Sequence, residues 1–95
     1  MKNDIEKYLD DKGRIKIWPA KIERKKEVLE YLSTKFDYAK FYTEKEVNSI
    51  IDNWHTFNDY FLLRRGLVDH KLLSRTRNGA QYWREGQFTT NTVGH

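Results

Sequence analysis

Ninety-five residues make one small domain, and six tyrosines, five phenylalanines and three tryptophans predict an aromatic-rich core. The chain has no cysteine, which excludes a disulfide framework and a thiolate metal site. Its net charge is +4. The first ten residues are too charged for a signal peptide, and no apolar run approaches the roughly 20 residues that span a bilayer. We therefore expect a cytoplasmic protein with no membrane contact.

The first third of the chain predicts an extension, a strand and a helix. Residues 1–12 form an N-terminal extension with a short helical pattern that ends in a turn at Asp10–Gly13. Residues 14–18 alternate polar and apolar side chains, which predicts a half-buried strand. Residues 20–36 predict the first core helix, whose apolar face contains Ile22, Val28, Leu29, Leu32 and Phe36. The basic residues at its start are either a solvated face, the simpler interpretation, or a contact to phosphates.

Two helices separated by a short break follow. The helix over 43–54 begins at Thr43, which with Glu46 has the spacing of a capping box, and its buried face contains Val47, Ile50, Ile51 and Trp54. In the helix over 58–70 we expect Tyr60, Leu63 and Leu67 to face the core, and Asn58, Leu62, Arg65 and Asp69 to face solvent. Gly66 costs roughly 1 kcal/mol in mid-helix relative to alanine, which points to a close helix approach or to a partner that fits over it.

A hairpin over 73–84 completes the domain. Asn78-Gly79 is the residue pair best able to take two positive φ angles, so we expect strands at 73–77 and 80–84, with Arg75 and Arg77 on one face opposite Tyr82 and Ala80. Phe41-Tyr42 is long enough for a short strand that pairs with this hairpin. The sequence therefore predicts an α+β winged helix-turn-helix over 1–85, with a three-helix core, a small antiparallel sheet and a hairpin wing. For the polar tail 86–95, disorder and an extra strand remain open.

No constellation of residues predicts catalysis. The three histidines lack metal-ligand spacing, the five glycines are isolated, and no serine lies in a nucleophile motif. We interpret His55 as a cap or surface residue, and Asp52 and Asp59 as helix-end residues. The sequence thus predicts neither an enzyme nor a cofactor or metal site.

The segment from Arg64 to Arg84 has the strongest excess of positive charge in the chain, with six basic residues and one acid, Asp69. Such a surface favours a polyanion, and we expect double-stranded DNA, bound by a dimer if its site is a palindrome. An amide can bond adenine and a guanidinium can bond guanine. The candidate nucleic-acid-binding residues are Asn58, Arg64, Arg65, Lys71, Arg75 and Arg77.

Two alternatives stand beside this hypothesis. The arginines can simply keep a small domain soluble, and Arg64 can instead pair with Asp59 or another helix-end acid. An exposed Phe61 or Leu62, together with Asp69, also suits a surface that binds another protein.

Several motifs in order resemble the bacterial family known as domain of unknown function 2087. They are Gly13 to Lys21 (GRIKIWPAK), Tyr42 to Asn48 (YTEKEVN), Leu63 to Asp69 (LRRGLVD), Leu73 to Arg75 (LSR), Gly79 and Tyr82-Trp83. Members occur alone or fused behind a separate DNA-binding domain in transcriptional regulators, so the resemblance implies a regulatory setting, in which the domain binds DNA, senses or recruits. It implies no catalytic residue. The family favours a glutamate where this chain has Gly66.

Overall fold

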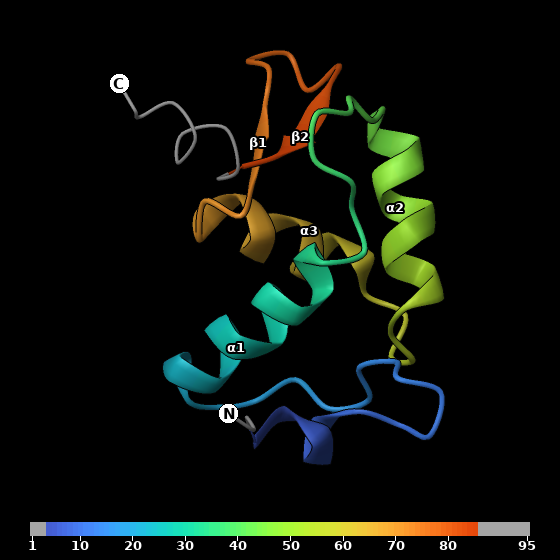
Figure 1. Ribbon diagram of the computed structural model, residues 1–95, viewed down its shortest axis with the longest axis vertical. Coiled ribbons are helices and arrows are strands. Elements are labelled where there is room, and N and C mark those ends of the chain that lie inside the picture. Colours follow the sequence, from blue (N-terminus) through green and yellow to red (C-terminus); the bar gives the residue numbers. More distant parts are fainter. Residues whose placement is uncertain (1–3, 86–95) are drawn as a thin grey trace.

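Three α-helices carry the fold, and a hairpin covers one end of them (Figure 1). The computed structural model describes residues 4–85. Its elements, in chain order, are a 3-10 helix η1 (Asp4–Tyr8), α1 (Ile22–Ser33), α2 (Glu44–Asn53), α3 (Tyr60–Asp69), β1 (Leu73–Arg75) and β2 (Tyr82–Arg84). The N-terminal segment lies at the opposite end from the hairpin. This arrangement confirms the α+β prediction and is compatible with a winged helix; the tail 86–95 lies outside the described residues.

Local side-chain caps start the second and third helices. Thr43 Oγ1 accepts from the Glu46 N–H at 3.1 Å, and a Glu46 carboxylate oxygen accepts from the Thr43 N–H at 2.9 Å, which is the expected capping box. Asp59 caps α3 by accepting from the Leu62 N–H at 3.2 Å. The backbone of Asn58 is left-handed, with φ 56°, so α3 begins two residues later than expected.

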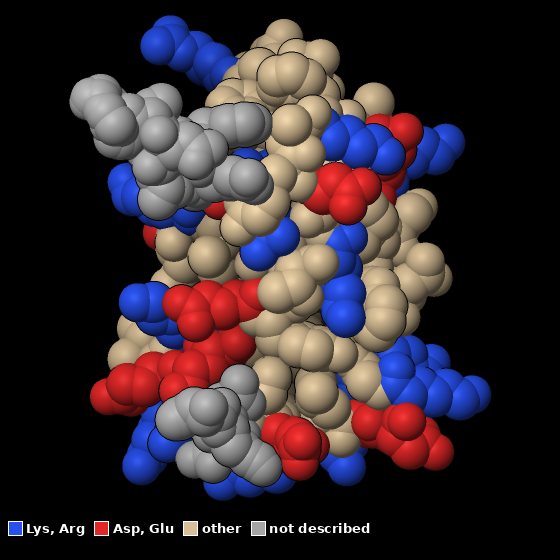
Figure 2. Space-filling view, in the orientation of Figure 1, with Lys and Arg blue, Asp and Glu red and all other residues tan. Residues whose placement is uncertain are grey.

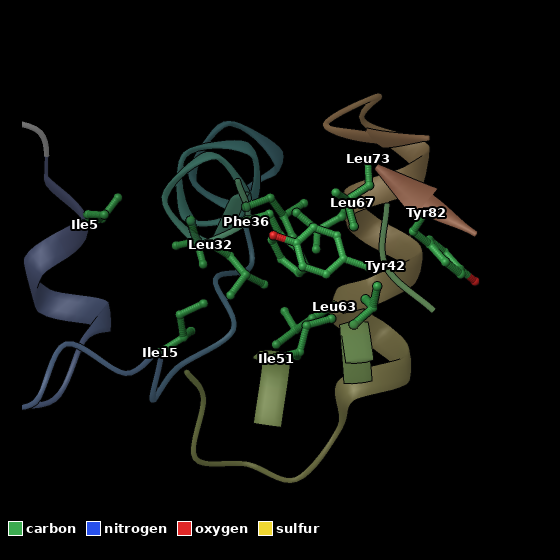
Figure 3. Packing of buried hydrophobic residues seen from close by; sticks show 13 residues of the cluster. Ile5, Ile15, Leu32, Phe36, Tyr42, Ile51, Leu63, Leu67, Leu73 and Tyr82 are labelled. Carbon is green, nitrogen blue, oxygen red and sulfur yellow. The ribbon is translucent and has the colours of Figure 1, made fainter. Parts of the chain in front are cut away.

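Every helix and strand of the described residues contributes apolar side chains to the core, and Figure 3 shows them converging from α1, α2, α3 and the hairpin. The apolar residues Val28, Leu29 and Leu32 of α1 are buried as expected, and so is Phe36, although α1 ends three residues before it. Ile22 is 64% exposed because it lies in the first turn, at the edge of the apolar stripe. At Gly66 an added Cβ would lie 3.1 Å from Leu29 Cδ1. The glycine therefore lets α3 approach α1 closely, one of the two explanations that the sequence suggested.

The strand expected at 14–18 is reduced to single-residue bridges at Ile15, which pairs with Leu9 on one side and with His55 on the other. Ile15 donates its N–H to the Trp54 carbonyl at 2.8 Å, and its own carbonyl accepts from the Thr56 N–H at 2.9 Å. The segment passes between η1 and the turn after α2. Its hydrogen-bonding neighbours therefore change after one residue, and the pairing does not extend into a longer β-ladder.

Asp10 organises the turn before Ile15. Its carboxylate accepts from the N–H groups of Lys12 at 2.9 Å and Arg14 at 2.8 Å, and from the Arg14 guanidinium at 2.9 Å. The hydrogen bond from the Arg14 backbone N–H is the main cause that lowers the pKa of Asp10 below its ordinary value, although desolvation acts in the opposite direction. Asp10 thus closes the turn most firmly in its charged form.

The hairpin is shorter than expected. Its antiparallel register pairs Leu73 with Arg84, Ser74 with Trp83 and Arg75 with Tyr82, so Arg77 and Ala80 belong to the turn. Among the described turn residues only Gly79 has a positive φ, at 75°; Asn78 instead accepts from the Ala80 N–H and the Thr76 hydroxyl at 3.0 and 2.8 Å. Such local side-chain bonds compete with a ladder and stabilise the longer turn.

The predicted third strand is present as one residue. Tyr42 and Tyr82 exchange two backbone hydrogen bonds, each of 2.8 Å, which gives the spatial order β1, β2, Tyr42. The chain therefore runs helix, bridge residue, helix, helix and hairpin.

Candidate nucleic-acid interface

The turn between α2 and α3 is fixed by His55, which is buried, with 4% of its surface exposed. Its Nε2 accepts from the Asp59 N–H at 2.8 Å, so Nδ1 carries the ring proton and donates it to the Ile51 carbonyl at 2.8 Å. The expectation of a cap is met, while that of a surface residue is wrong. At the end of α2 the ring N–H takes the place of a backbone N–H as donor to the Ile51 carbonyl. On its other side the ring holds Asp59, the residue that caps α3.

Three of the candidate cations line one open cleft of about 460 Å³ between α3, the start of α2 and the hairpin. Arg64 and Arg65 come from α3, and Arg75 comes from β1. The other lining residues are Glu44, Phe61, Val68, Asp69 and Tyr82. The cleft therefore combines guanidinium groups with two acids and two aromatic rings.

Arg64 is held inside this cleft. Its side chain is only 13% exposed, and its Nη1 donates to Asn48 Oδ1 at 2.6 Å and lies 3.2 Å from a Glu44 carboxylate oxygen. Its guanidinium carbon also lies 5.8 Å from the ring centre of Tyr60 and 5.4 Å from that of Phe61. Arg64 thus braces α3 against α2, and the helix-end acid that was expected as its partner is Glu44.

Arg65 has the opposite environment. Its side chain is 70% exposed, and its distance of 3.7 Å to Asp69, which is 64% exposed, makes a weak ion pair. Phe61 and Asp69 are exposed on α3 as expected, with 56% of Phe61 accessible, whereas Leu62 is half-buried. The outer side of α3 therefore presents a loosely paired guanidinium beside an uncovered ring.

The remaining candidates lie around the cleft. Lys71, with φ 63°, follows α3 and lines an adjoining hollow together with Arg75, Asp69, Ser74 and Glu85. Arg77 is exposed in the hairpin turn, and Asn58 is exposed before α3; neither lines the cleft. The structure thus brings Arg65 and Arg75 to one cleft and Lys71 to the adjoining hollow, whereas Asn58 and Arg77 line neither.

Acidic side chains interrupt the basic surface, and Figure 2 shows both signs interspersed over the face in view. Glu44 was missed as a member of the site because it lies far from Arg64 in the chain. A Cβ at Gly79 would lie 3.7 Å from a Glu44 carboxylate oxygen and 3.8 Å from Arg75 Nη1, so the hairpin turn lies beside the start of α2. The only sequence signal for Glu44 was its position in the first turn of a capped helix.

Within residues 4–85, no three or more His, Cys, Asp or Glu side chains come together in a way that could hold a metal ion. The helices of the described segment are all too short or too polar to cross a membrane.

Comparison with known proteins places the chain in a family. No curated protein and no solved structure matches it. Residues 14–84, from the turn after Asp10 to the end of β2, match the family described as "Uncharacterized protein conserved in bacteria (DUF2087)". Because the match covers the three α-helices and the hairpin, the chain belongs to this bacterial family.

Proposed function

We propose that the protein binds double-stranded DNA and acts in transcription regulation, with α3 in the major groove and the hairpin against the adjacent backbone. One observation carries the proposal: Arg65 from α3 and Arg75 from β1 line one open cleft. The three helices and the hairpin follow one another along the chain in an order compatible with a winged helix. In helix-turn-helix proteins the second helix of the motif enters the groove, while nearby cations hold phosphates.

The availability of the cations supports the proposal. Arg65 can leave Asp69 at little cost, since exposed pairs are worth about 0–1 kcal/mol. Lys71, Arg75 and Arg77 form no ion pair with any other residue of the segment 4–85. In our proposal all four contact phosphate or base edges, and Arg64, already paired with Glu44, positions α3 rather than contacting DNA.

The test is a salt titration. Each neutralised phosphate contributes about 0.9 to the slope of log K against log salt, so two to four contacts predict a slope of about −2 to −4. The double variant Arg65→Glu with Arg75→Glu should abolish binding to duplex pools at low salt. Fluorescence anisotropy with labelled random duplexes measures both quantities.

The matched control changes the same net charge elsewhere. Lys12→Glu with Lys16→Glu reverses two exposed cations in the N-terminal segment, at the other end of the molecule from the hairpin (Figure 1). We expect this variant to keep most of its binding. Equal losses in the two double variants, or binding that does not depend on salt, would refute a specific interface at the cleft.

A second candidate is a protein-binding surface on α3. Phe61 and Tyr60 are 56% and 38% exposed, and the acids of the cleft reduce its attraction for phosphate. This candidate predicts a homo- or hetero-oligomer that Phe61→Asp dissociates. If the wild-type protein shows no affinity for duplex DNA, size-exclusion chromatography with light scattering on the wild type and on Phe61→Asp distinguishes this candidate from the first.

A further inference from the structure

We infer that Phe61 is a specificity-determining residue that contacts the 5-methyl group of thymine in the major groove. This inference rests on the proposed function and names the base feature that the interface recognises. It gives a role to the exposed phenyl ring at the cleft, which the recognition of phosphates leaves unused.

The position of Phe61 is the first argument. It is the second residue of α3 and precedes Arg65 by four positions, so the ring and the guanidinium lie on the same side of the helix. Both line the cleft that Arg75 borders from the hairpin. Residues in the N-terminal half of a recognition helix are the ones that reach base edges.

The environment of the ring is the second argument. The guanidinium of Arg64 lies 5.4 Å from the ring centre, and it is itself anchored to Asn48 at 2.6 Å and to Glu44 at 3.2 Å. More than half of Phe61 nevertheless remains exposed, at 56%. A ring that is held from one side loses little further side-chain freedom when a ligand covers the other side.

The chemistry of the groove supplies the third argument. A phenyl ring offers no hydrogen bond, and the apolar group that bases present in the major groove is the 5-methyl of thymine. Arg65 and Arg75, which line the same cleft, match the charge of the phosphates that neighbour such a contact. Burial of one methyl corresponds to about a fourfold change in affinity.

The experiment replaces thymine by deoxyuridine, which removes the methyl and keeps the base pair. Duplexes selected by the wild-type protein from a random pool are resynthesised with each thymine exchanged in turn, and affinities are measured by anisotropy. We expect one or two positions at which the exchange weakens wild-type binding about three- to fivefold, and no effect of the exchange at those positions for Phe61→Ala.

A second phenylalanine provides the control. Phe41 is 60% exposed, lies outside the cleft and contacts Trp83 edge to face at 5.6 Å between ring centres. Phe41→Ala should retain the full uracil penalty. Circular dichroism of both variants verifies that the helices are intact.

The outcomes separate the inference from the proposed function. Steep salt-dependent duplex binding with no uracil penalty at any position, or a penalty that persists in Phe61→Ala, overturns the role of Phe61 and leaves DNA binding in place. Absence of duplex binding by the wild type overturns both. Loss of an oligomer in Phe61→Ala, with base preference unchanged, assigns the ring to a protein contact and overturns the inference.

Discussion

Replacing Arg64 by methionine tests whether this residue braces the helix pair. The substitution keeps an apolar stem but removes the hydrogen bond to Asn48, the ion pair with Glu44 and the contacts with two rings. A hydrogen bond from a charged donor contributes about 1.5–3 kcal/mol. The ion pair adds less than about 1 kcal/mol, because Glu44 is 48% exposed.

The expected loss for Arg64→Met is therefore about 2–3 kcal/mol, which corresponds to about 10–20 °C in the melting temperature of a domain of this size. Urea unfolding monitored by tryptophan fluorescence and thermal unfolding by circular dichroism measure it. Arg65→Met is the matched control, since its side chain is 70% exposed, and it should change stability by less than about 0.5 kcal/mol.

A double-mutant cycle sharpens the result. Arg64→Met combined with Asn48→Ala should cost less than the sum of the two single changes, by about 1.5–3 kcal/mol, because both remove the same hydrogen bond. Equal stabilities of the Arg64 and Arg65 variants would refute the brace. So would a salt slope of DNA binding that falls by about one unit in Arg64→Met while stability is unchanged.

Three further predictions concern the fold. Leu63→Ala, at a fully buried position of α3, should destabilise the protein by about 2–5 kcal/mol in urea unfolding, and a loss below 1 kcal/mol would contradict its burial. Thr43→Ala should cost about 1 kcal/mol through the capping box, whereas Thr43→Ser should cost little. Because the pKa of Asp10 is lowered on folding, its charged form contributes stability that is present above its unfolded value near 3.8 and is lost as pH falls through the folded value. Asp10→Asn should therefore be less stable at neutral pH and should weaken this acid-dependent loss; an unchanged pH profile of thermal unfolding would contradict the role of the carboxylate.

The sequence predicted those features whose partners lie within one helical turn or one hairpin. The capping box of Thr43 and Glu46 joins residues three apart, and the inward positions Leu63 and Leu67 follow from helical period alone. The bridge at Tyr42 was also foreseen, because a short apolar pair before a helix cap fits the order of a winged domain.

The features that were missed depend on partners brought together by tertiary packing. Glu44 reaches Arg64 only because α2 and α3 lie side by side, and Ile15 pairs with two segments that are distant from each other in the chain. His55 is buried because both of its ring nitrogens find backbone partners, which no spacing rule indicates. The turn at Asn78 differs because its side chain bonds locally instead of allowing a second left-handed residue.

The reciprocal bonds between Tyr42 and Tyr82 have a consequence for the way any ligand associates. They attach the hairpin to the segment that leads into α2, and Arg64 attaches α2 to α3, so the spacing between α3 and the hairpin is set before a partner arrives. Association should then proceed as rigid docking, and the heat-capacity change of binding should reflect the contact area alone, without a contribution from coupled folding.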